Sequence, residues 1–140
     1  MYQLFAQKVY DSEQLRQTLS QDDAVISATD ITKATGREDA LAYKLVLNPE
    51  KLGINLNTIT DGDLADDEET FLANMKISDD YAKKLCESLN VNYSLIEVFS
   101  ARYDYESEEI GIVCLVSIMY IETARKKQKD LMKRLFANIE

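Results

Sequence analysis

Residues 93–122, YSLIEVFSARYDYESEEIGIVCLVSIMYIE, decide the fold of this chain. Two runs within this stretch, Tyr93–Tyr105 and Ile110–Glu122, are rich in β-branched and aromatic side chains, and the polar segment 106–109 separates them. This pattern predicts two antiparallel strands joined as a hairpin. The second strand is apolar on both of its faces. We therefore expect it at the centre of a sheet, or covered by helices on both sides.

The segments upstream predict further strands. Residues 24–35 and 41–47 flank the turn 36–39 and are expected to form a second hairpin. Residues 2–10 fit one short N-terminal strand. Residues 49–63 follow no clean period and contain several Gly and Asn, so we expect short turns there.

Helices are predicted over residues 12–20, from an N-cap at Ser78 to about residue 90, and from a cap at Thr123 to about residue 138. The last of these carries its apolar residues on one side and its Lys and Arg on the other. These elements predict the α+β class, with residues 1–140 forming a single domain. We expect a mostly antiparallel sheet built from two hairpins plus an N-terminal strand, helices packed on one face, and a long C-terminal amphipathic helix.

The composition excludes several kinds of site. The 140 residues include no His and only four scattered Gly, and the formal net charge is −9. A chain without His has no Ser-His-Asp triad and no imidazole ligand for zinc. Its glycines form no phosphate-binding loop. An acidic chain has no general affinity for nucleic acid or for anionic membranes. We therefore predict no cofactor, no metal, no catalytic residue, and no direct nucleic-acid or membrane partner.

The sequence also predicts a cytoplasmic location. The first 14 residues lack the basic and apolar pattern of a secretory signal. No apolar run reaches the ~18–20 residues that a membrane span needs. The two cysteines, Cys86 and Cys114, are expected to be reduced thiols, with Cys114 inside a buried strand. Neither has a His to activate it as a nucleophile.

Charge is distributed unevenly along the chain. Six of the nine residues 61–69 are acidic, whereas residues 123–140 hold six cations and two anions, a net charge of +4. The other 122 residues carry −13. We expect the basic helix to pair with the acidic segment 61–69 or with the turn 106–109. A second copy of the chain or an acidic ligand is the alternative.

The acidic segment partly fits a calcium-binding EF-hand loop. With Gly62 at the sixth position, Asn57 falls at the first and Glu68 at the twelfth. Ile59 at the third position offers no side-chain oxygen, and the preceding residues make a poor entering helix. We therefore do not predict a metal site. A solvated loop that caps the next helix and a protein-binding acidic face both stay open.

The strand over residues 93–105 holds three tyrosines. Tyr93, Tyr103 and Tyr105 have the same parity, so a regular strand would place them on one face. That face is either part of the core or an aromatic interaction surface, and Arg102 would point away from it. By the same parity, Glu97 and Asp104 are expected on opposite faces.

We predict a small acidic protein-binding module of the inhibitor, immunity or chaperone type, a class that includes phage-encoded inhibitors. It would dock on the basic surface of a partner protein through charge complementarity and an aromatic patch. A structural or assembly subunit that forms homo-oligomers, such as a homodimer, is the alternative, and a carboxylate-based enzyme is less favoured. The candidate partner-binding residues are Asp61, Asp63, Asp66, Asp67, Glu68, Glu69, Arg102, Tyr103, Tyr105, Glu106, Glu108 and Glu109.

Overall fold

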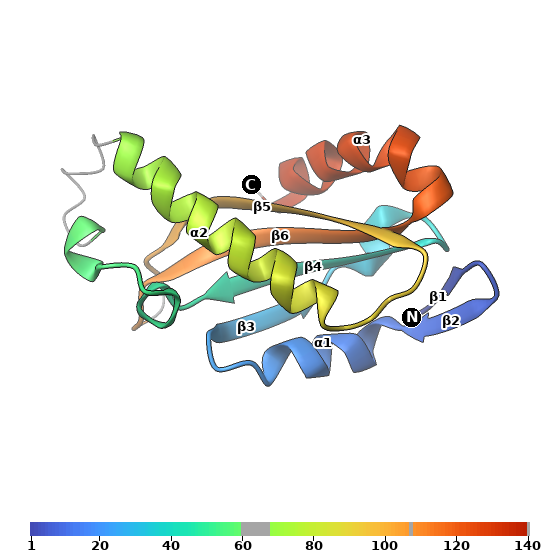
Figure 1. Ribbon diagram of the computed structural model, residues 1–140, viewed down its shortest axis with the longest axis horizontal. Helices are drawn as coiled ribbons and strands as arrows, with labels where there is room; N and C mark the ends of the chain where they lie inside the picture. The colour runs from blue at the N-terminus through green and yellow to red at the C-terminus, as the bar shows by residue number, and fades with distance from the viewer. Residues whose placement is uncertain (60–67, 107, 140) are drawn as a thin grey trace.

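The computed structural model describes residues 1–59, 68–106 and 108–139, and Figure 1 shows how its elements are arranged. The strands are β1 (Tyr2–Phe5), β2 (Lys8–Asp11), β3 (Val25–Asp30), β4 (Ala40–Leu47), β5 (Ser94–Asp104) and β6 (Gly111–Tyr120). The α-helices are α1 (Ser12–Ser20), α2 (Glu68–Glu87) and α3 (Ile121–Ile139). Three short 3-10 helices are η1 (Thr32–Thr35), η2 (Pro49–Leu52) and η3 (Leu56–Thr58).

The centre of the molecule is a four-stranded antiparallel sheet with the strand order β3-β4-β6-β5. β6 pairs with β4 on one side and with β5 on the other, and its residues 111–119 are all buried. A strand with two neighbours and covered faces needs apolar side chains of both parities. This confirms the central place predicted for the apolar run, and it confirms the α+β class.

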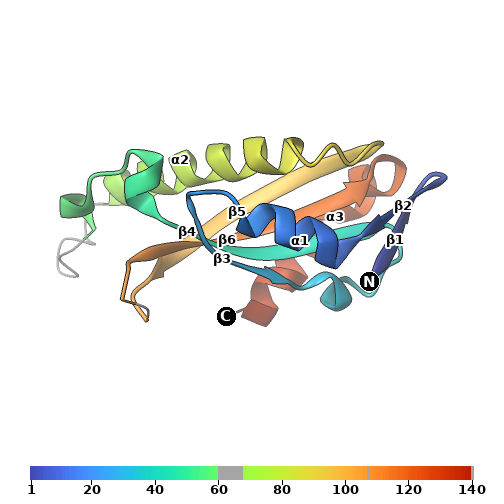
Figure 2. The same cartoon turned by 90° about the horizontal axis from the view of Figure 1, so that it is seen from below.

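Both faces of this sheet are covered, so the prediction that the helices pack on one face is wrong for α3. Tyr43, Leu45 and other residues of one parity pack with α1 and α2. Ala42, Met119 and others of the opposite parity pack with α3. In Figure 2, α2 lies above the strands and the C-terminal end of α3 lies below them. The cause is that β4 and β6 expose apolar side chains on both faces, and each face requires its own cover.

The N-terminal segment is a hairpin, not the single strand predicted over residues 2–10. It turns at Ala6, whose φ of 57° is in the left-handed region, and β1 and β2 pair as a separate two-stranded sheet. Gln3 is one of the residues that hold this hairpin to the rest of the molecule, together with Phe5, which is buried in the core. The buried side-chain amide of Gln3 donates hydrogen bonds to the carbonyls of Arg37 and Ala40, at 2.5 and 2.6 Å.

The helix α1 is confirmed over residues 12–20, with the Asp11 carboxylate accepting from the Glu13 amide at 3.1 Å as N-cap. The predicted N-cap at Ser78 is wrong. Residue 78 lies inside α2, which is one helix of 20 residues, and its buried hydroxyl accepts a hydrogen bond from Ser100 at 2.8 Å. An apolar stripe that runs through this position, from Met75 to Ala82, keeps the helix continuous because it packs on the sheet.

Further boundaries differ from the predictions by a few residues. The strand expected over residues 24–35 ends at Asp30 and continues as η1. The last helix begins at Ile121, two residues before the predicted cap. The turns expected from residue 49 onward are present up to residue 59 as η2 and η3.

A β-bulge in β5 changes which side chains share a face. The register shifts between Ser100 and Arg102, so residue 101 has no partner in β6. Before the bulge, Phe99 lies on the α3 face, where its ring packs against Phe136. After the bulge, Tyr103 pairs with Ile112 and lies on the α2 face. The strand is therefore not regular, and the prediction that parity alone places Tyr93, Tyr103 and Tyr105 on one face is wrong.

The same bulge overturns the prediction for two carboxylates of β5. Glu97 pairs with Ser117, and Asp104 pairs with Gly111. These partners have the same parity in β6, so both carboxylates lie on the α3 face. They line different hollows, with Glu97 beside α3 and Asp104 near the end of the strand.

Candidate protein-binding surface

The described residues of the predicted surface gather at one end of the molecule, where α2 begins and where β5 turns into β6 (Figure 1). We call this the acidic end and define it by Glu68, Glu69, Tyr103, Tyr105, Glu106, Glu108 and Glu109. Of the other predicted residues, Arg102 lies beside this end, and Asp61, Asp63, Asp66 and Asp67 lie outside the described residues. Tertiary structure thus brings Phe71, near the start of α2, against Tyr103, near the end of β5.

Packing against α2 fixes the base of the acidic end. The rings of Phe71 and Tyr103 meet edge to face, with centroids 5.5 Å apart. The Asn74 side-chain amide donates to the Tyr103 hydroxyl at 3.0 Å and to the Thr58 hydroxyl at 3.2 Å. Burial raises the pKa of Tyr103 although the bond from Asn74 opposes this, so its hydroxyl stays protonated at neutral pH. The sequence pattern does not by itself indicate Phe71 and Asn74 as supports, although Phe71 belongs to the apolar stripe of α2.

The outer part of the acidic end is exposed. Tyr105 has 55% of its surface accessible, and its ring centroid lies 6.2 Å from that of Tyr103. Glu106 and Glu108 are exposed beside it, and the Glu106 amide donates to the Asp104 carboxylate at 2.9 Å. An exposed aromatic ring on a packed base, with the carboxylates of Asp104 and Glu106 next to it in the chain, is suited to act as an anchor in a protein interface.

Arg102 and Tyr103 point to opposite faces of β5, as predicted, since they are consecutive residues after the bulge. Arg102 contributes to a hollow of about 260 Å³ on the α3 face of the sheet. Its lining residues are Lys44, Arg102, Tyr103, Asp104, Tyr105, Glu106 and Val113. The two cations therefore border the acidic end but do not cover its exposed ring.

The six cations of α3 lie apart from the acidic end. The helix starts where β6 ends, at the opposite end of the strand from the β5–β6 turn (Figure 1). All six are exposed, and no ion pair within residues 1–59, 68–106 and 108–139 involves them. Arg134 instead donates to the Thr35 carbonyl at 2.7 Å. The expected pairing of the basic helix with the turn 106–109 is therefore not found, and the molecule carries separate acidic and basic surfaces.

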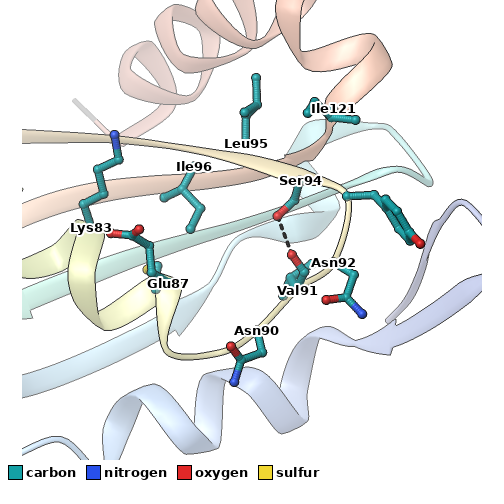
Figure 3. A pocket seen from close by; sticks show the side chains of 11 residues that line it. Lys83, Glu87, Asn90, Val91, Asn92, Ser94, Leu95, Ile96 and Ile121 are labelled. Atoms are coloured by element: carbon teal, nitrogen blue, oxygen red, sulfur yellow. Dashed lines mark hydrogen bonds between the residues drawn. The ribbon is translucent and has the colours of Figure 1, made fainter.

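A larger hollow, of about 540 Å³, lies between the end of α2 and the start of β5 (Figure 3). The loop beneath it is held by a bond from the Ser94 hydroxyl to the Val91 carbonyl at 2.7 Å. Glu87 is the one carboxylate among the residues lining it. Cys86 also lines it, but burial raises the pKa of that thiol to about 12, so it is not a thiolate at neutral pH. This hollow offers neither a carboxylate pair nor an activated nucleophile.

Among the described residues, no three His, Cys, Asp or Glu side chains lie close enough together to hold a metal ion. The central part of the EF-hand-like loop lies outside those residues. None of the helices described combines the length and the apolarity that crossing a membrane requires. No protein-family model, curated protein or solved structure matches this chain.

Proposed function

We propose that this protein is a small acidic binding module that docks its acidic end on a basic surface of a partner protein. The observation that carries the proposal is the exposed ring of Tyr105, which lies against Tyr103 of the packed pair Phe71–Tyr103 and lines a hollow together with Asp104 and Glu106. An inhibitor, an immunity-type protein and a chaperone all use this physical mode of binding.

Binding through this surface has two stages. The carboxylates of the acidic end first attract a cationic surface, which raises the association rate and makes it sensitive to salt. The Tyr105 ring then loses its remaining exposed area in a pocket of the partner. Because Asn74 and Phe71 already fix its neighbour Tyr103, little side-chain order has to be gained on binding.

A second candidate function is that of an assembly subunit. The separation of the α3 cations from the acidic end supports it, because two copies can then place opposite charges together. Sedimentation velocity distinguishes the two candidates. A chain that stays monomeric at high concentration and low salt would remove the assembly function.

The first test compares two variants with the same change of charge. The immobilised protein captures basic proteins from the extract of its native cell, and each captured protein is then purified and its binding measured by surface plasmon resonance. We expect Glu106→Gln/Glu108→Gln to slow association and to weaken its dependence on salt. The matched control, Glu87→Gln/Glu122→Gln, removes two exposed carboxylates far from the acidic end. It should leave the association rate and its dependence on salt unchanged.

The second test removes the anchor. Tyr105→Ala should weaken binding by about 2 kcal/mol, roughly thirtyfold, mostly through faster dissociation. Tyr93→Ala, at another exposed tyrosine outside the acidic end, is the control. A binding affinity that does not depend on salt concentration would contradict the proposal. Equal losses of affinity in Tyr105→Ala and Tyr93→Ala would contradict it as well.

A further inference from the structure

The outer edge of β5 is unpaired over part of its length. β5 is the last strand in the sheet order, so no described strand lies on its outer side. The Ser100 amide points to this side, because it donates to the Asp79 carboxylate of α2 at 2.6 Å. Backbone direction alternates along a strand, so the amides of Val98 and Ile96 point outward as well. None of the described side chains bonds to those two amides, and such an edge is a template for another strand.

The helix α3 runs alongside this part of β5. The Ile121 amide bonds to the Tyr93 carbonyl, and the Gln128 side chain bonds to the Leu95 carbonyl at 3.0 Å. Further along, Phe136 packs on Phe99. Helix and strand therefore advance in the same direction, and Figure 1 shows α3 alongside the half of β5 that α2 does not cross. The result is a long border between an open strand edge and a helix.

A groove of about 370 Å³ lies along this border. Its apolar walls are Val98 and Phe99 of β5 and Met132 and Phe136 of α3. Phe99 has 45% of its surface accessible, a large exposure for a phenylalanine ring, so the groove presents apolar surface to the solvent.

Cations border the same groove. Lys129 and Lys133 line it, and Arg125 belongs to the same helical row because these residues are spaced four apart. All three are exposed, and none forms an ion pair with a described residue. Glu97 is the only carboxylate among the lining residues. The row of positive charge favours a ligand that brings carboxylates to it.

We propose that this groove binds an extended acidic peptide segment of a partner protein, which adds to the sheet as a strand beside β5. Its backbone pairs with the outward groups of Ile96 and Val98. Its side chains of one parity face α3, where the apolar ones enter the groove against Phe99 and Phe136 and the carboxylates between them reach Lys129 and Lys133. This surface is separate from the acidic end, so the proposal stands independently of the function proposed above.

The probe is a fluorescein-labelled decapeptide whose odd positions alternate between Phe and Glu and whose even positions are Thr, so that the Phe and Glu side chains share one face of the strand. It is added to the intact protein and followed by fluorescence anisotropy. We expect Lys133→Glu to weaken binding at least about tenfold. Lys127→Glu makes the same charge change on the far side of α3 and should have a small effect. Phe99→Ala tests the apolar wall, and its partial exposure makes it compatible with folding.

Two further measurements test strand addition itself. Peptides N-methylated at residues of one parity lose the donors on one of their edges, and one of the two methylation patterns should abolish binding while the other retains it. Hydrogen exchange at the amides of Ile96 and Val98 should slow when the unmethylated peptide binds.

Several outcomes would overturn the proposal. These are no binding of the decapeptide, equal losses for Lys133→Glu and Lys127→Glu, equal tolerance of both methylation patterns, or unchanged exchange at Ile96 and Val98. Sedimentation velocity of the protein alone can give one more outcome that overturns the proposal. A dimer that Lys133→Glu dissociates would assign the groove to a second copy of the chain instead.

Discussion

At the scale of single residues, close packing around β6 leaves no spare volume at the start of that strand. Gly111 is buried there, and a β-carbon at this position would overlap Cγ1 of Val46 on the neighbouring strand. The backbone of Gly111 is not in the left-handed region, so the need for glycine is one of space and not of conformation. The sequence alone did not distinguish these two reasons.

The first prediction concerns this contact. Gly111→Ala should lower the free energy of unfolding by about 1–3 kcal/mol, because the added methyl group has to displace Val46. In a Val46→Ala background the same change should cost less than ~1 kcal/mol, since the overlapping methyl group is gone. Urea denaturation of the four proteins measures the coupling. Equal costs in both backgrounds would show that Val46 is not the obstacle.

At the scale of elements, the bulge in β5 and the N-terminal hairpin are the features that most change the predicted arrangement. The bulge at residue 101 moves Tyr103 to the α2 face and gives the acidic end its packed base. The hairpin β1–β2 is attached through the buried side chains of Gln3 and Phe5 and a backbone bond from Leu4 to Glu38, rather than by pairing with the main sheet. Both are consequences of contacts between segments that are distant in sequence.

The second prediction concerns the attachment of the hairpin. Gln3→Ala leaves the carbonyls of Arg37 and Ala40 without that donor, and we expect a loss of about 1–3 kcal/mol in the free energy of unfolding. Gln14→Ala, on the exposed side of α1, should stay within about 0.5 kcal/mol of the parent. A Gln3→Ala protein as stable as the Gln14→Ala control would mean that water replaces the lost bonds.

At the scale of the whole molecule, stability depends on carboxylates whose pKa values are shifted in opposite directions. Burial alone would raise the pKa of Asp39, but hydrogen bonds from Arg37 and Thr123 outweigh it and lower that pKa. Burial raises the pKa of Asp79 despite its bond from Ser100. The lowered pKa gives stability that is lost as pH falls. The raised pKa gives stability that is lost as pH rises above the unfolded value of about 4.

The third prediction follows from these signs. Asp79→Asn keeps an oxygen that accepts from Ser100 but cannot ionise, so its stability relative to the parent should increase as pH rises from about 3 to 7. Asp39→Asn should show the opposite trend, with little effect near pH 3 and a loss at pH 7. Urea denaturation at each pH measures both. Parallel pH profiles for the parent and Asp79→Asn would contradict the raised pKa.

The molecule as a whole carries its opposite charges on separate surfaces. The expected neutralisation of the basic helix by the turn 106–109 does not occur, because α3 begins at the far end of β6 from that turn. The sequence shows both charged segments, but it does not give the distance between them in the folded molecule. This separation allows the two surfaces to act independently, one as the acidic end and the other beside the groove of β5.

The sequence by itself determined the class of fold, the two hairpins, the amphipathic C-terminal helix and the central place of β6. These follow from local periodicity, which depends only on residues close in the chain. Only the tertiary structure decided that α3 covers the second face, that one helix runs through Ser78, and that Tyr103 rests on Phe71. Each of these depends on contacts between distant segments, and burial against a neighbouring element outweighs the weaker local preferences for caps and regular strands.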